Sequence, residues 1–419
     1  MRLNKVAEKL RAQVQQFSGI ISPHFSKPKA RFIQQMLFGI AASQDCKLSS
    51  IARALGERIS LKKVEERLSH HLATPGLGDA VQQQLVVQAA RRISCQTLLV
   101  VDITDLRKSY AQAMPYLEWV RDGSSGELVP GYWCGVALAC EAGSRRVLPL
   151  WAQLWSTAAP GFVSENAQLL GIIDRIAAAT GGRGVYVLDR GGDRSRLYRA
   201  LLDRGLQFII RLVGDRHLLV RGRLRRADDL ARGVQLKYAE MVVREQEGGE
   251  KKCRLEYGFR KVKLPGRRDV DLALVVVKGF GSEPLLLLTN LPVKASRRSV
   301  WRVVMGYLSR WLVEETIRFL KQSYQLEDLR LLGWERLCNM VGLVMATAYF
   351  AAGWLGESLK LAVLASRVMK VAKRFFGVPA FHYYALADGL RVLLSRIGWW
   401  QRRRAATPSS PQLWLFRFT

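Results

Sequence analysis

The sequence predicts an α/β core that is preceded and followed by helical segments. Strand-like and helix-like segments alternate in the middle of the chain, which is typical of a mixed sheet covered by helices. Helical periodicity precedes and follows that region. At 419 residues, the chain also exceeds what one hydrophobic core usually organises. The expected units are residues 1–92, 93–212, 213–296, 297–356 and 357–419.

The first unit, 1–92, is expected to be a small helical DNA-binding domain. A helix over 48–55, a left-handed stop at Gly56 and a capping residue at Ser60 outline a helix-turn-helix. A plain helical bundle fits the same pattern equally well. The second helix would have an apolar and a basic stripe, with Leu61, Val64 and Leu68 inside and Lys62, Lys63 and Arg67 outside.

The next three units are expected to form the core. Residues 213–296 carry Val-rich strands interleaved with Lys and Arg and no clear helix between them, which predicts an inserted, mainly β subdomain. Helical periodicity returns after Ala295 and continues to about residue 396. Before the insertion we expect strands over 97–104, 131–142, 145–155, 184–189 and 207–212, with helices over 163–180 and 195–204.

The charge of the chain points to nucleic acid. It contains 65 Lys and Arg against 35 Asp and Glu, a formal net charge of +30, so a polyanion would relieve its self-repulsion. A basic chain can also reflect solubility or binding to an anionic membrane surface. The last unit, 357–419, is a basic helical region that ends in Arg402, Arg403 and Arg404 and a short tail. It is a candidate DNA surface, and an ordinary solvated helical face is the alternative.

Several other classes of protein are not supported. The six cysteines are scattered without zinc-site spacing, and they are expected to be reduced and buried in a cytoplasmic protein. No secretory signal is evident, and the apolar run from Met340 to Leu355 is too short for a bilayer span, so a buried helix is expected there. The histidines form no catalytic arrangement, no phosphate-binding GxxxxGK[ST] loop is present, and no small-molecule substrate is indicated.

Two aspartates lie where a catalytic site would form in an α/β sheet. Asp102 interrupts an apolar strand, and Asp189 ends another strand just before a Gly191-Gly192 turn. A buried carboxylate is costly unless it is paired or bound to a metal. Either aspartate alone could equally be a turn or cap residue. Asp105 and Asp193 are local alternatives to these two.

The segment that begins at Tyr307 adds a third carboxylate. On a continuous helix, Tyr307, Arg310, Glu314 and Lys321 would fall within roughly 60° of one face. An Arg310 to Glu314 surface pair would explain part of this pattern without any function. Arg318 shares the stripe, Glu315 competes with Glu314, and Trp301 and Trp311 could stack on a displaced base or pack in the core.

Three carboxylates suit two-metal phosphoryl transfer, since Mg²⁺ prefers oxygen ligands. The residues Tyr307-x2-Arg310-x3-Glu314-x6-Lys321, together with the two upstream aspartates, resemble the DDE transposases of bacterial insertion sequences in the insertion-sequence-four group. That resemblance covers most of the chain and implies an RNase H-like catalytic core interrupted by the β insertion.

The resemblance also implies the function and its residues. Asp102, Asp189 and Glu314 would be catalytic and would hold two Mg²⁺ or Mn²⁺ ions, while Tyr307, Arg310 and Lys321 would contact the transposon end. Arg318 and Trp311 are further candidate DNA contacts. The expected partners are double-stranded DNA, as terminal inverted repeats and target, and a second copy of the chain in a synaptic complex. The alternatives are an RNase H-like nuclease without strand transfer and a catalytically inactive DNA-binding protein.

Overall fold

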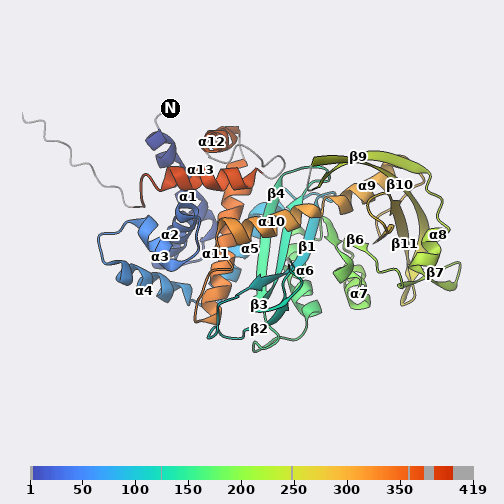
Figure 1. Cartoon of the computed structure of the whole chain (residues 1–419), viewed down its shortest axis with the longest axis horizontal. Helices are drawn as coiled ribbons and strands as arrows, with labels where there is room; N and C mark the ends of the chain where they lie inside the picture. The colour runs from blue at the N-terminus through green and yellow to red at the C-terminus, as the bar shows by residue number, and fades with distance from the viewer. Residues whose placement is uncertain (1–2, 124, 247–248, 357–358, 372–381, 400–419) are drawn as a thin grey trace, which may run out of the picture.

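The computed structural model describes residues 3–123, 125–246, 249–356, 359–371 and 382–399. Its centre is one mixed sheet of 12 strands with helices packed on it (Figure 1). The α/β fold class expected from the sequence is confirmed. The strands of the first half are β1 (Leu98–Arg107), β2 (Glu118–Arg121), β3 (Leu128–Cys140), β4 (Val147–Trp155), β5 (Val185–Leu188) and β6 (Gln207–Arg211).

The central strands combine an antiparallel part and a parallel part. β1 pairs with β3, and β3 with β4, in antiparallel fashion, whereas β1, β5 and β6 run parallel to one another. Parallel neighbours need crossover connections, and α6 (Glu165–Thr180) and α7 (Ser195–Asp203) supply them. β2 is a strand that the sequence pattern did not reveal. It is short, and its side chains alternate between exposed and buried.

The inserted residues extend the same sheet. β12 pairs with β6, and the order then continues through β11, β10, β7 and β8, with β9 pairing on β10. The segment 213–236 contains two short strands and a short helix, α8, although no helix was expected in the insertion, because 6 residues are too few to show a helical period. The elements of the whole insertion are β7 (His217–Val220), β8 (Arg223–Arg226), α8 (Ala227–Arg232), β9 (Tyr238–Gln246), β10 (Gly249–Leu264), β11 (Arg267–Lys278) and β12 (Leu285–Thr289).

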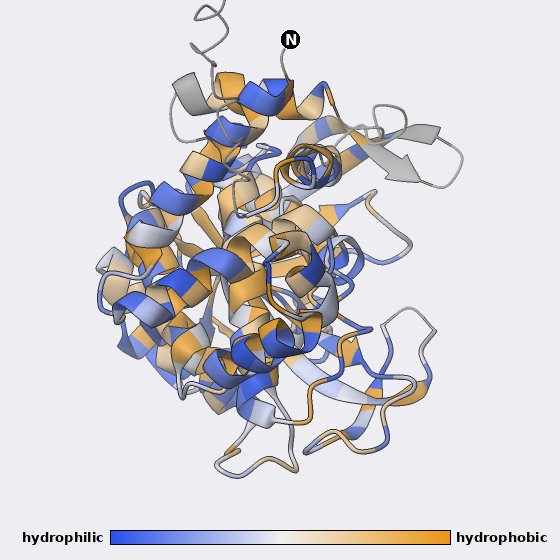
Figure 2. Ribbon diagram, turned by 90° about the vertical axis from the view of Figure 1, so that its left-hand side faces the viewer, coloured by the Kyte–Doolittle hydropathy of each residue, from blue (hydrophilic) through white to orange (hydrophobic). Residues whose placement is uncertain are grey.

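The N-terminal helices pack against helices from the other end of the chain. α1, α2 and α5 contact α11, and α1 and α2 also contact α13, so a single hydrophobic cluster runs from Val6 to Trp399. Figure 2 views this end of the molecule and shows hydrophilic residues on the outer sides of the helices. The helices are α1 (Leu3–Ile21), α2 (Lys27–Ser43), α3 (Leu48–Leu55), α4 (Leu61–Leu72), α5 (Leu77–Ala90), α11 (Trp334–Ala352), α12 (Leu359–Met369) and α13 (Tyr383–Leu394).

The helix-turn-helix outline differs in detail from the sequence expectation. Gly56 is left-handed, with φ 63°, as expected, but Ser60 makes no side-chain capping hydrogen bond. Leu61 is exposed, whereas Val64 and Leu68 are buried. Arg67 is held by Glu57 at 2.5 Å instead of facing solvent freely, so Lys62 and Lys63 are the exposed cations of this helix.

The helix expected to run through Tyr307 is broken in two. α9 (Arg297–Leu308) ends before Ser309, and α10 (Trp311–Ser323) begins after Arg310. Tyr307 therefore belongs to a different helix from Glu314 and Lys321, and its side chain is buried. α11 is the buried helix expected around Met340, and none of the helices in the described ranges is long and apolar enough to cross a membrane. None of the six cysteines, all of which lie in the described ranges, forms a disulfide, but Cys95 is exposed, contrary to expectation.

Close packing of α5 on α11 depends on two glycines. A Cβ atom at Gly342 would lie 2.8 Å from the Cα of Gly78 and 2.9 Å from its carbonyl oxygen. Because both contacts are backbone atoms, Gly342→Ala should force the helices apart and lower the free energy of unfolding by about 1–2 kcal/mol. Gly19→Ala in α1, where no atom lies within 4 Å, should instead gain about 0.5–1 kcal/mol. Urea unfolding of both variants checks this, and equal midpoints would contradict it.

Candidate active site

Two aspartates meet at one edge of the parallel part of the sheet. Val100 of β1 pairs in register with Val187 of β5, and Asp102 and Asp189 each lie two residues further on. Residues two apart on a strand point to the same face, and neighbouring strands lie about 4.8 Å apart. The two carboxylates are therefore neighbours on one face. The Asp189 side chain also accepts a hydrogen bond from the Gly191 backbone at 2.8 Å, which fixes its direction.

Arg310 links Asp102 to a third carboxylate. Its Nη1 donates to Asp102 Oδ2 at 2.8 Å, and its Nη2 donates to Glu314 Oε1 at 2.5 Å. α10 packs on β1 and β3 (Figure 1). Through Arg310, this brings Glu314 near Asp102. The side chain of Glu314 is 54% exposed, whereas those of Arg310 and Asp102 are 18% and 14% exposed. One guanidinium thus bridges a buried and an exposed carboxylate.

The carboxyl of Asp102 has a raised pKa. Burial is the main cause, and together with the charges of Asp189 and Glu314 it raises the pKa to about 7, although Arg310 acts to lower it. For Arg310, burial acts to lower the pKa, but Asp102, Tyr307 and Glu314 hold it above its usual value. Negative charge is therefore concentrated here beyond what one arginine neutralises.

The neighbouring acids have other partners. Asp105 is buried and accepts from Lys321 at 3.2 Å and from the Gly123 backbone at 3.2 Å. Asp193 pairs with Arg216 at 2.7 Å, and its side chain is fully buried. Glu315 pairs with Arg318 at 2.5 Å. Of the acids considered from the sequence, Asp102 and Asp189 are neighbours, and Glu314 is linked to Asp102 through Arg310.

The other candidate DNA contacts are spread around this cluster. Lys321 is held between Asp105 and Glu327, with the Glu327 contact at 3.0 Å. The Tyr307 ring lies under Arg310, 5.9 Å from its guanidinium carbon. Trp311 is 39% exposed beside Arg310. Trp301 instead packs on Tyr257, with ring centroids 5.3 Å apart, so its role is in the core.

One residue near the site was not identified from the sequence. Lys108, directly after β1, is buried, and its Nζ donates to three backbone carbonyls at 2.6, 3.1 and 2.9 Å. These carbonyls belong to Leu326, Glu327 and Leu329, which follow α10. Burial lowers the pKa of Lys108 to about 8. A lysine that ends an amphipathic strand gives no signal of burial, because its partners lie more than 200 residues away in the chain.

The carboxylate oxygens are suitable ligands for a divalent cation, although their side chains do not form a complete coordination site. Across the described ranges, no group of three His, Cys, Asp or Glu side chains is close enough to hold a metal ion. The guanidinium of Arg310 lies between Asp102 and Glu314, which accounts for their separation. The adjacent carboxylates of Asp102 and Asp189 are hard oxygen donors with excess negative charge, the donor set that Mg²⁺ prefers.

One known protein family matches more than half of the chain. Residues 93–351, which include all three carboxylates, match the transposase DDE domain, so the chain belongs to that family. Its class is therefore transposase. A piggyBac transposase synaptic complex with hairpin DNA is similar in structure over 93% of this chain and 78% of that chain, with 10% sequence identity and a TM-score of 0.44. A search of curated proteins found no match.

The raised pKa of Asp102 predicts how the free energy of unfolding depends on pH. Between the usual pKa near 3.8 and about 7, the folded protein binds the Asp102 proton more tightly than the unfolded chain does. The free energy of unfolding should therefore fall as pH rises through this window. At pH 8 without divalent ions, Asp102→Asn should be more stable than wild type by about 1–3 kcal/mol. Urea unfolding at pH 5 and pH 8 measures this, and a less stable variant at pH 8 would contradict it.

Proposed function

We propose that this chain is a bacterial cut-and-paste DNA transposase of the insertion-sequence-four group. It would bind the terminal inverted repeats of its element, nick to expose a 3′-OH, free the element and join that end to target DNA. The observation that carries the proposal is the adjacent position of Asp102 and Asp189 at one edge of the sheet, with Glu314 linked to Asp102 through Arg310. An RNase H-like core acting in the bacterial cytoplasm, on the nucleoid, is part of this proposal.

In this proposal Asp102 and Asp189 would hold two divalent ions, Mg²⁺ or Mn²⁺. Glu314 would become the third metal ligand once its ion pair with Arg310 is broken. Bound ions of this kind would activate the attacking oxygen and stabilise the leaving oxygen in phosphoryl transfer. Arg310 would then turn from the carboxylates to a DNA phosphate, for which its planar guanidinium is well suited. Glu314 can move because its side chain is half exposed, whereas Asp102 is fixed by its strand.

The remaining residues would position DNA. The Tyr307 ring makes a cation–π contact with the guanidinium of Arg310, and ion pairs with Asp105 and Glu327 orient Lys321. Trp311 is exposed next to Arg310 and is available to stack on a base. Arg318 lies further along α10 and is 57% exposed. Family resemblance adds a homodimeric synaptic complex and a hairpin intermediate to the proposal.

The test uses a labelled duplex that carries the element's own end and a supercoiled plasmid as target, with and without Mg²⁺. Metal-dependent nicking at the end, followed by joining of the labelled strand to the plasmid, is the expected result. Nicking without joining would indicate a nuclease that lacks strand transfer. Specific binding without nicking would indicate a DNA-binding protein that has lost catalysis.

A further inference from the structure

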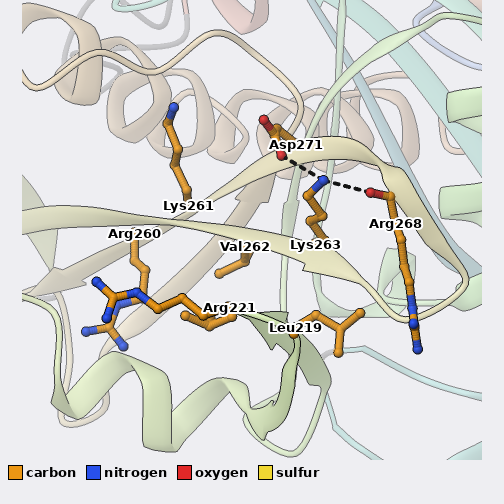
Figure 3. A pocket seen from close by; sticks show the side chains of 10 residues that line it. Leu219, Arg221, Arg260, Lys261, Val262, Lys263, Arg268 and Asp271 are labelled. Atoms are coloured by element: carbon orange, nitrogen blue, oxygen red, sulfur yellow. Dashed lines mark hydrogen bonds and ion pairs between the residues drawn. The ribbon is translucent and has the colours of Figure 1, made fainter.

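The outer end of the sheet carries a basic groove that the proposed chemistry does not use. It is a hollow of about 740 Å³ between the β7–β8 turn and the β10–β11 hairpin. Five cationic side chains and one carboxylate line it, namely Arg221, Arg260, Lys261, Lys263, Arg268 and Asp271. Figure 3 shows Arg221, Arg260 and Arg268 pointing to one side of β10, whereas Lys261 points to the other.

The three arginines of this groove are not neutralised. Within the part of the chain that the structure describes, Arg221 and Arg268 have no carboxylate partner, and Arg260 donates to the Gly233 carbonyl at 2.8 Å. The lining carboxylate, Asp271, is paired with Lys263 at 3.2 Å. Four other arginines of this region, Arg226, Arg232, Arg254 and Arg267, do pair with carboxylates. Three guanidiniums around one open hollow therefore carry positive charge with no local counter-charge.

Arg221 also has an unusual backbone conformation. It is left-handed, with φ 49°, and the following Gly222 has φ 76°. A tight two-residue hairpin requires this conformation, and Asn or Gly adopts it at much lower cost than Arg. Arg221 therefore occupies a strained backbone position, and strained positions of this kind cluster at ligand-binding sites.

Arg260, one of the three arginines of the groove, lies on the opposite face of the sheet from Asp189. Following the strand pairings across the sheet, Arg260 falls in the same row as Leu188, through Leu274, Leu288 and Ile210. Asp189 is the next residue after Leu188, and consecutive residues of extended chain point to opposite faces. The phosphates held by the groove would therefore belong to a different DNA segment from those at the carboxylates.

We infer that Arg221, Arg260 and Arg268 form a second, sequence-independent binding site for the phosphate backbone of duplex DNA. The inference rests on the proposed function and deepens it, because it gives the enzyme a hold on a DNA segment that it does not cut. Guanidiniums suit phosphate oxygens, and each phosphate contact contributes about 0.9 to the slope of log affinity against log salt.

The test compares two triple variants by fluorescence anisotropy with a 40-base-pair duplex that lacks the terminal repeat. R221Q/R260Q/R268Q should weaken binding roughly tenfold or more at about 0.1 M salt and reduce the salt slope by about 3. The matched control is R232Q/R254Q/R267Q, which removes the same charge from arginines paired with Asp229, Glu256, Asp203 and Asp269. The control should change the slope by less than about 1.

A single substitution separates binding from folding. Arg221→Gly should weaken duplex binding and leave thermal stability equal or higher, because glycine relieves the left-handed backbone. Cleavage of a short end duplex at saturating protein should proceed at the wild-type rate in the groove variants. Three results would each overturn the inference. The first is an equal salt slope for the two triple variants, and the second is loss of short-duplex cleavage in the groove variants. The third is a groove variant that loses binding to single-stranded RNA but still binds the duplex as wild type does. Absence of cleavage by wild type would instead count against the proposed function alone.

Discussion

Glu314→Gln is expected to lower metal-dependent cleavage of the element's end by roughly 10³-fold while DNA binding survives. Glutamine keeps the size of the side chain and can still accept from Arg310, so α10 should keep its place. It removes the negative charge that the ions would require. The measurement is the single-turnover rate of nicking of a labelled end duplex in Mg²⁺, with binding followed in parallel at the same protein concentrations.

Glu315→Gln is the matched control for this experiment. Glu315 is the next residue on α10, and its carboxylate pairs with Arg318. It should cleave within about fivefold of wild type, because a surface pair contributes little. A full rate for Glu314→Gln would remove Glu314 from the site, and equal losses in both variants would point to a structural effect on α10.

Lys108→Met is expected to have the largest effect on stability, lowering the free energy of unfolding by about 3–5 kcal/mol. Methionine fills a similar volume but cannot donate, so the carbonyls of Leu326, Glu327 and Leu329 lose a buried donor together. Those residues follow α10, and Glu327 holds Lys321. Cleavage should therefore fall as well, with more effect on the rate than on DNA affinity.

Urea unfolding followed by circular dichroism measures this prediction. Lys47→Met is the control, since Lys47 is 42% exposed and reaches Asp45 and Asp328 only at 4.0 and 3.8 Å. Its midpoint should differ from wild type by no more than the equivalent of about 0.5 kcal/mol. A loss below about 1 kcal/mol for Lys108→Met would show that water replaces the ammonium at the three carbonyls.

The sequence by itself determined those features that depend on local pattern. A strand that Asp102 interrupts and a strand that Asp189 ends follow from runs of apolar residues bounded by turn signals, and the spacing from Arg310 to Glu314 follows from helical periodicity. These patterns predicted the α/β fold, and the resemblance that they carry predicted the transposase family. Local pattern did not reveal β2, β7, β8 or α8, because short elements have too few residues to establish a period.

Only the tertiary structure decided how these parts meet. Tyr307 is buried on α9, whereas Glu314 and Lys321 lie on a separate helix, α10. The bridge from Arg310 to Asp102 joins residues 208 apart in the chain, and the three carbonyls at Lys108 are more than 200 residues from it. The pairing of β12 with β6 makes the insertion part of one sheet and places Arg260 on the face opposite Asp189. Contacts of this kind depend on which distant segments pack together, and a periodic pattern within one segment carries no information about its partner.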